Sequence, residues 1–156
     1  ETGHRAKKIY SHDDLFYIGR GPDCAAAPEC SLKLKEISYI HSEAYAAGEL
    51  KHGTLSLVTE GTPVIALATD PKYYDKMTGN IREVKSRGGY VILVAAPDFP
   101  SPDEYADDVF VLPAVDPTLS PLESAVFSQL LAYEAALLRG CDVDHPRNLA
   151  KSVTVE

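Results

Sequence analysis

Two continuous apolar runs constrain most strongly what this chain can fold into. Residues 63–69 read Pro-Val-Ile-Ala-Leu-Ala-Thr, and residues 90–95 read Tyr-Val-Ile-Leu-Val-Ala. Runs of this length, rich in β-branched residues and without polar alternation, are typical of strands buried on both faces of a parallel sheet. Shorter apolar runs at 15–18 and 108–112 predict two more strands.

Helical segments separate these strands. Asp70-Pro71 supplies a cap and a first-turn proline for a helix ending near Arg87, with Gly79 as a possible break. Ser120-Pro-Leu-Glu123 has the pattern of a capping box before a long helix that ends at Gly140. The predicted buried side of that helix consists of Leu122, Val126, Leu130, Leu131, Leu137 and Leu138. Strands alternating with helices over 156 residues predict one α/β domain, a parallel sheet covered on both faces.

A third predicted helix carries a row of charges. No Gly or Pro interrupts the chain between Pro28 and Gly48, and helical spacing puts Glu29, Lys33 and Glu36 on one face. Apolar stripes flank the row on both sides: Cys30, Leu34 and Ile37 with His41, and Leu32 with Tyr39. Two interpretations stay open: a solvated row of ion pairs on a surface helix, or the lining of a crevice in which charged groups perform acid–base chemistry.

The turn before this helix, Gly19-Arg-Gly-Pro-Asp-Cys24, lies where α/β folds often hold phosphate. It contains no Ser or Thr, and Asp23 would repel an anion. A tight turn capped by Asp23 is therefore favoured. Because ligands of parallel sheets bind at the carboxyl ends of the strands, we expect the start of the Glu29–Glu36 helix at the ligand edge.

Charge and cysteine content narrow the function classes. The formal net charge of −8 argues against nucleic acid or an anionic membrane as partner, and no run is long enough to span a membrane. Three cysteines, Cys24, Cys30 and Cys141, lack metal-ligand spacing and indicate reduced thiols in a cytoplasmic protein, with no metal or cofactor predicted. The chain begins Glu1-Thr-Gly, without methionine or signal peptide, so we expect a piece of a longer polypeptide.

Three segments are highly specific: residues 34–41 (Leu-Lys-Glu-Ile-Ser-Tyr-Ile-His), 43–53 (Glu-Ala-Tyr-Ala-Ala-Gly-Glu-Leu-Lys-His-Gly) and 142–156 (Asp-Val-Asp-His-Pro-Arg-Asn-Leu-Ala-Lys-Ser-Val-Thr-Val-Glu). From about Leu15 to Glu156 the chain resembles the carboxy-terminal part of the glutamine–fructose-6-phosphate aminotransferase (isomerising) family. The resemblance implies a flavodoxin-like sugar isomerase (SIS) fold of about five parallel strands, specifically the second of two tandem SIS subdomains. The polar residues 1–13, mixed in charge, indicate a lead-in linker or a frayed helix end, and the resemblance implies an SIS domain at 14–141 and a catalytic tail at 142–156.

The resemblance also implies roles for single residues in making glucosamine 6-phosphate from fructose 6-phosphate and glutamine. Glu36 would move a proton between C1 and C2 of the open-chain sugar, with Lys33 placing positive charge near the enolamine. His52 would open the sugar ring. Lys151 would form a Schiff base with the C2 carbonyl, while Glu29, Ala150 and Lys151 would bind the sugar.

The resemblance implies partners as well: a glutaminase domain, the first SIS subdomain and a second copy of the chain. In the family, the phosphate-gripping Ser/Thr loop belongs to the first SIS subdomain, and histidines of the His52 type act across a dimer interface. Thr54 stands where the family commonly has Pro. Two hypotheses follow: an enzyme part that is inactive alone, or a stand-alone SIS module that binds a sugar phosphate as a sensor or with a partner chain. A different SIS isomerase or deaminase is a third option, against which the tail sequence argues.

Overall fold

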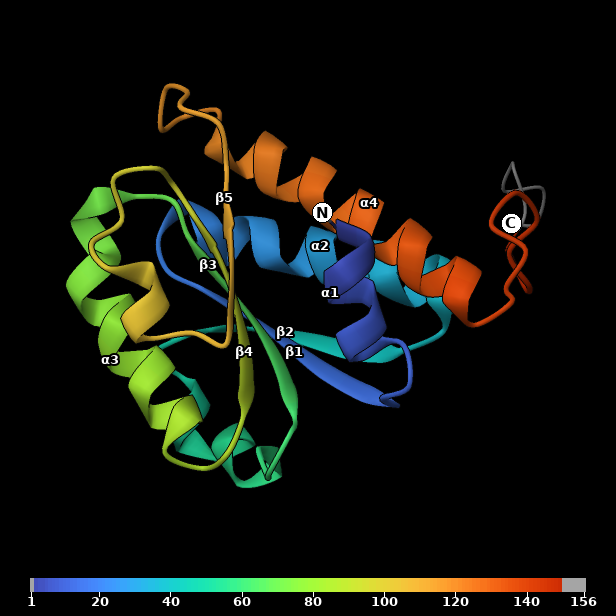
Figure 1. The fold of residues 1–156 in the computed structure, drawn as a ribbon, viewed down its shortest axis with the longest axis horizontal. Coiled ribbons are helices and arrows are strands. Elements are labelled where there is room, and N and C mark those ends of the chain that lie inside the picture. Colours follow the sequence, from blue (N-terminus) through green and yellow to red (C-terminus); the bar gives the residue numbers. More distant parts are fainter. Residues whose placement is uncertain (1, 150–156) are drawn as a thin grey trace, which may run out of the picture.

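Five parallel strands form the centre of the computed structural model, which describes residues 2–149 (Figure 1). They are β1 (Asp14–Gly19), β2 (His41–Ala46), β3 (Pro63–Ala68), β4 (Tyr90–Ala95) and β5 (Asp108–Val111), in the order β2-β1-β3-β4-β5. This is the flavodoxin-like order, and it confirms the predicted five-stranded parallel sheet with helices on both faces.

Two apolar layers hold the helices against the sheet. On one face, α1 (Thr2–Ile9), α2 (Pro22–Ser38) and α4 (Ser120–Leu138) cover strand side chains such as Tyr17 and Ile65. On the other face, α3 (Tyr74–Lys85) packs with the short turns η1 (Leu50–His52) and η2 (Thr54–Leu57). Two further turns, η3 (Pro71–Tyr73) and η4 (Pro102–Glu104), precede α3 and β5. Gly79 lies inside an unbroken α3, so no break occurs there.

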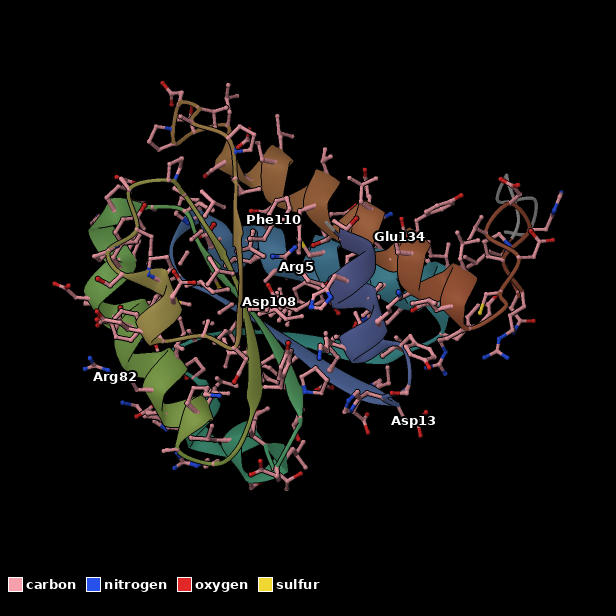
Figure 2. All side chains as sticks on the ribbon, in the orientation of Figure 1. Arg5, Asp13, Arg82, Asp108, Phe110 and Glu134 are labelled. Carbon is pink, nitrogen blue, oxygen red and sulfur yellow. The ribbon has the colours of Figure 1, made fainter. Side chains whose placement is uncertain are left out.

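Residues 1–13 were predicted as a linker or a frayed helix end, and the linker interpretation is wrong. Helix α1 buries Ala6 and Ile9 completely in the layer shared with α4. Arg5 forms an ion pair of 2.7 Å with Asp108 at the start of β5 and stacks on Phe110 at 5.1 Å (Figure 2). The buried apolar side chains and the contacts of Arg5 together dock a helix that composition alone does not reveal.

Strand β2 is the element that the sequence did not predict. Residues 41–46 were assigned to a helix that continued to Gly48, but α2 ends at Ser38 and β2 begins at His41. Buried hydroxyls connect the two elements: Ser31 Oγ donates to the carbonyl of Ser42 at 2.9 Å, and Ser42 Oγ donates to the carbonyl of Ser31 at 2.9 Å. The serine side of α2 therefore faces the protein, and Leu32 on the flank is 41% exposed.

Helix α4 buries the opposite face from the one predicted. Its buried side consists of small residues with two larger ones: Ser120, Ser124, Phe127, Ser128, Leu131, Ala132, Ala135 and Ala136. Of the residues predicted to be buried, only Leu131 is; Leu122, Val126, Leu130, Leu137 and Leu138 are 40 to 65% exposed. Small residues let α4 lie close to α2, and the larger apolar side chains point outward. Among the described residues, no helix is long and apolar enough to cross a membrane.

Candidate functional site

The charge row of α2 is present in the structure and forms ion pairs along the helix. Lys33 Nζ lies 3.0 Å from Glu36 Oε2 and 3.3 Å from Glu29 Oε1. All three side chains are partly exposed, at 26% for Lys33, 31% for Glu36 and 51% for Glu29. The hydrogen bond to Glu36 raises the pKa of Lys33, with Glu29 adding to it, so this lysine is held in its charged form.

An open groove beside Glu36 is lined in part by residues 147–149. We call it the tail groove; its walls are Leu32, Lys35, Glu36, Tyr39, Arg147, Asn148 and Leu149. Glu36 therefore faces the part of the chain that leads directly to position 150. Ala150 and Lys151 lie outside the described residues, and their roles stay predictions.

The structure separates His52 from Glu36 within one chain. Strands β1 and β2 pair from Asp14 with His41 to Gly19 with Ala46, so β2 begins at the amino edge of the sheet and ends at the carboxyl edge. Glu36 lies in the last turn of α2, just before β2 begins. His52 follows the end of β2 in η1, whose Leu50 packs in the layer with α3. Glu36 thus precedes the amino end of β2 and His52 follows its carboxyl end, and the two elements that carry them pack on opposite faces of the sheet.

The helix that carries Glu29 and Glu36 starts at the carboxyl edge of the sheet, as predicted, because it follows directly after the end of β1 at Gly19, but its charge row lies farther along the helix. Helix α2 begins at Pro22, seven residues before Glu29, and includes Pro28 in its interior. At about 1.5 Å per residue, Glu36 lies roughly 21 Å along the helix from Pro22. The charge row therefore occupies the middle and the amino-edge end of α2.

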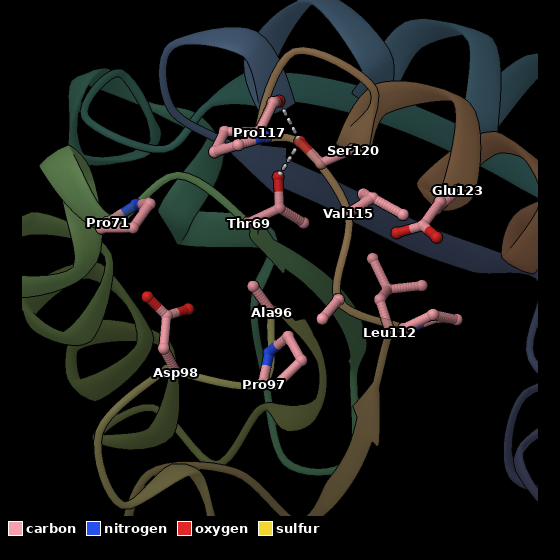
Figure 3. Close-up of a pocket in the computed structure, with 12 residues that line it drawn as sticks. Thr69, Pro71, Ala96, Pro97, Asp98, Leu112, Val115, Pro117, Ser120 and Glu123 are labelled. Atoms are coloured by element: carbon pink, nitrogen blue, oxygen red, sulfur yellow. Dashed lines mark hydrogen bonds between the residues drawn. The ribbon is translucent and has the colours of Figure 1, made fainter.

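The carboxyl edge of the sheet holds a separate pocket of about 200 Å³ (Figure 3). Polar side chains of Thr69, Asp98, Ser120 and Glu123 line it among prolines and apolar residues. Asp98 accepts a hydrogen bond of 2.6 Å from the hydroxyl of Tyr74. Two carboxylates at its walls disfavour a phosphate, which agrees with the absence of a Ser/Thr loop at residues 19–24.

Asp23 and Ser120 were predicted to cap helices, and neither does so. Asp23 is 1% exposed and accepts the backbone N–H of Thr69 at 2.8 Å. The Thr69 hydroxyl oxygen lies 2.6 Å from Asp23 Oδ1. It also lies 2.7 Å from Ser120 Oγ, and Ser120 Oγ lies 2.8 Å from the carbonyl oxygen of Pro117 (Figure 3). We call this chain of four groups, which is buried except at Pro117, the Asp23 network. It ties α2, β3 and α4 together beneath the pocket, and burial raises the pKa of Asp23.

One contact near Glu36 was not predicted from the sequence. Tyr39 receives a hydrogen bond from the backbone N–H of Arg147 at 2.9 Å, and the Arg147 guanidinium stacks over its ring. The partners are 108 residues apart, and no spacing rule relates them. Within residues 2–149, no cluster of three or more His, Cys, Asp and Glu side chains could hold a metal ion.

Comparisons with known proteins agree on one family. A family model described as the SIS domain matches residues 8–139. The glutamine–fructose-6-phosphate aminotransferase [isomerizing] of Clostridium acetobutylicum is 56% identical over 151 residues, which are 97% of this chain and 25% of that protein. The chain thus spans about a quarter of the length of the curated relatives it matches.

Solved structures give the same result. The C-terminal domain of glucosamine-fructose-6-phosphate aminotransferase from Francisella tularensis matches with a TM-score of 0.87 and 36% identity, covering 92% of this chain and 41% of that chain. Glucosamine-6-phosphate deaminase from Thermotoga maritima matches with a TM-score of 0.73 and 26% identity, covering 97% of this chain and 44% of that chain. The deaminase shares less sequence with this chain than the aminotransferase does, so the option of a deaminase gains no support.

Proposed function

The chain belongs to the SIS domain family, and from this premise we propose that it is the second SIS subdomain of a glutamine–fructose-6-phosphate aminotransferase. The observation that carries the proposal is the high identity, over nearly the whole chain, to curated proteins of that name. In this role the chain would help to convert fructose 6-phosphate and glutamine-derived ammonia into glucosamine 6-phosphate.

Glu36 and Lys33 would carry out the proton transfer. Interconversion of a ketose and an aldose needs one base that takes a proton from one carbon and returns it to the next. A carboxylate on a rigid helix, open to the tail groove, supports this role for Glu36. Lys33, held in its charged form 3.0 Å away, would stabilise negative charge that develops on the sugar oxygen, with Glu29 fixing its other side.

Lys151 would attack the sugar from the tail. Its neutral amine would add to the C2 carbonyl, forming an imine with release of one water, and ammonia would then displace the lysine to leave the amino group on the sugar. The support is positional: the described end of the tail lines the same open groove as Glu36. Ala150 would contact the sugar next to it.

His52 would act in the site of a second subunit. Ring opening needs a group that titrates near neutrality, a property of histidine. Since Glu36 precedes the amino end of β2 and His52 follows its carboxyl end, one chain does not bring them together. A homodimer, in which His52 of one copy completes the site of the other, would resolve this separation.

The exposed face of α4 supports a second partner, the first SIS subdomain. Leu122, Val126, Leu130, Tyr133 and Leu137 form a continuous stripe and are 44 to 65% exposed; we call it the α4 stripe. Beside it, a groove is lined almost entirely by apolar atoms, with Phe110 and Leu112 of the sheet edge at its floor. Exposed apolar surfaces of this kind mark interfaces. More than half of the solved aminotransferase domain lies outside the match to this chain, which leaves room for such a subdomain to cover the stripe.

The test combines binding and activity. Calorimetric titration of fructose 6-phosphate into the 156-residue chain should show no binding, because the proposed phosphate grip lies in the first subdomain. In the full-length enzyme, Glu36→Gln should lower kcat for amino-sugar formation by about 100-fold or more. Glu104→Gln on the exposed turn η4 is the matched control and should leave kcat unchanged.

The alternative is a stand-alone module that binds a sugar phosphate as a sensor or with a partner chain. Clear binding to the isolated chain, lost in Lys151→Ala, would favour that module over the enzyme part. A full-length Glu36→Gln enzyme that keeps most of its activity would remove Glu36 from the mechanism. We also propose a cytoplasmic location, since free thiols at Cys24, Cys30 and Cys141 suit a reducing compartment.

A further inference from the structure

We propose that Tyr39 is a positioning residue that anchors the carboxy-terminal tail, so that Lys151 is delivered to the site of Glu36. The positioning role rests on the proposed function, whereas the anchoring itself does not. The proposal follows from four observations: a double contact between Tyr39 and Arg147, the backbone conformation of Tyr39, the turns that lead to Arg147, and the distances along the chain.

Arg147 makes two different contacts with the same side chain. Its backbone N–H donates to the Tyr39 hydroxyl at 2.9 Å, and its guanidinium carbon lies 4.0 Å from the centroid of the Tyr39 ring. The first contact fixes the tail backbone, and the second is a cation–π interaction that fixes the side chain. Both depend on one tyrosine, so a single substitution tests them.

Tyr39 holds a backbone conformation that a bulky residue adopts at a cost. Its φ is 60° and its ψ is 17°, in the left-handed region, where a residue with a Cβ loses about 1–2 kcal/mol. The neighbours on either side, Ser38 and Ile40, are completely buried and hold it in place. A glycine would end α2 here without strain. The tyrosine instead places a half-buried ring at the point where the tail passes.

The chain between α4 and Arg147 follows fixed turns. Gly140 has a φ of 68°, and the N–H of Cys141 donates back to Ala136 at 2.9 Å. Asp142 then accepts the N–H groups of residues 144 and 145 at 3.0 and 3.1 Å. These bonds hold the pKa of Asp142 below its usual value. The tail therefore reaches Tyr39 already folded back across the end of α2.

Distances along the chain connect the anchor to the proposed chemistry. Glu36 precedes Tyr39 by three residues, about 4.5 Å along the helix axis. Lys151 follows Arg147 by four residues, so their α-carbons are at most about 14 Å apart. Under this proposal, anchoring Arg147 on Tyr39 limits how far the chain that leads to Lys151 can reach from Glu36. Without the anchor, the last attachment before Lys151 would be the turn at Asp142, and the lysine would search a larger volume.

Trypsin tests the anchor in the 156-residue chain, since cleavage after Arg147 requires the tail to detach. The rate of release of the peptide beginning at Asn148, measured by mass spectrometry, should rise roughly 5- to 10-fold in Tyr39→Gly. Tyr39→Phe keeps the ring and loses only the hydroxyl, so its rate should rise about 2- to 5-fold. Tyr10→Phe, a distant exposed tyrosine, should cleave like the wild type. An unchanged rate in Tyr39→Gly would overturn the anchor.

Steady-state kinetics of the full-length enzyme test the positioning. In Tyr39→Gly, kcat for glucosamine 6-phosphate formation should fall roughly 5- to 10-fold, with KM for fructose 6-phosphate nearly unchanged, because the proposed phosphate grip is elsewhere. Arg147→Ala should lower kcat similarly, and the double variant should be no worse than either single variant. Tyr39→Phe keeps the ring, so its kcat should fall much less than that of Tyr39→Gly.

The outcomes separate the two proposals. Additive losses in the double variant, or faster cleavage with unchanged kcat, would show that Tyr39 does not position the tail through Arg147. A wild-type full-length enzyme that makes no amino sugar would refute the proposed function and, with it, the delivery of Lys151. The cleavage experiment would still decide whether Tyr39 anchors the tail.

Discussion

Replacing Asp23 by Asn should stabilise the chain at neutral pH, although it removes the charge of a completely buried side chain. The Asp23 network contains three oxygen–oxygen contacts in sequence. Asp23 contacts Thr69 at 2.6 Å, Thr69 contacts Ser120 at 2.7 Å, and Ser120 contacts the Pro117 carbonyl at 2.8 Å. The two hydroxyls supply only two protons. An ionised Asp23 therefore leaves one contact without a proton, whereas a protonated carboxyl or an amide supplies the third.

The magnitude follows from that missing proton. An unsatisfied buried polar group costs about 1–3 kcal/mol, and part of this is offset because hydrogen bonds to a charged acceptor are stronger. We expect the free energy of unfolding of Asp23→Asn to exceed that of the wild type by about 1–2 kcal/mol near pH 8. Asp23→Ala is the matched control. It leaves the buried N–H of Thr69 without its acceptor and should lose about 2–4 kcal/mol.

The advantage of Asp23→Asn should depend on pH. Burial raises the pKa of Asp23, so between its ordinary value near 3.9 and the raised value the folded state binds more protons than the unfolded state. The stabilisation of the wild type by this group is thus lost as pH rises through that window, at about 1.4 kcal/mol for each pH unit. Asparagine does not titrate, so the difference should be smallest near pH 4 and largest near pH 8. Urea unfolding followed by circular dichroism across this range measures it. A difference that stays constant with pH, or an Asn variant less stable than the wild type at pH 8, would refute the reasoning.

The remaining predictions concern two surfaces of the same helical layer. Leu130→Asp on the α4 stripe should change the free energy of unfolding of the isolated chain by less than about 0.5 kcal/mol. In the full-length enzyme the same substitution should abolish activity, and it should abolish assembly as measured by light scattering. Its buried neighbour gives the opposite pattern, since Leu131→Ala should cost about 2–4 kcal/mol in urea unfolding. Arg5→Met should cost about 3 kcal/mol because it leaves the carboxylate of Asp108 buried without its partner, and adding Asp108→Asn should restore part of the loss. The exposed Lys7→Met on the same helix should be neutral, and equal effects of Arg5→Met and Lys7→Met would contradict the role of the ion pair.

The sequence predicted the strands whose own residues show that both faces are buried. The runs at 63–69 and 90–95 became β3 and β4, because a central parallel strand has no solvent face and therefore no polar alternation. Strand β2, at the edge, reads His-Ser-Glu-Ala-Tyr-Ala, and this composition is compatible with a helix. Only its pairing with β1 and the bonds between Ser31 and Ser42 make it a strand.

The same distinction holds for the helices and the site. In α4, the larger apolar residues were predicted to be buried. The buried face instead consists mainly of serines and alanines, because α2 and α4 lie close together there. The row of Glu29, Lys33 and Glu36 was predictable, since its spacing is a property of the helix alone. The contact between Tyr39 and Arg147 was not, because it depends on how two distant segments meet.

The joining of the first and last helices has an evolutionary consequence. Arg139, at the end of α4, donates to the carbonyls of Tyr10 and His12, which lead from α1 into β1. A fold whose first and last helices pack side by side can be added to another gene, or duplicated beside itself, without a linker that crosses the molecule. Curated relatives about four times as long as this chain fit such an arrangement.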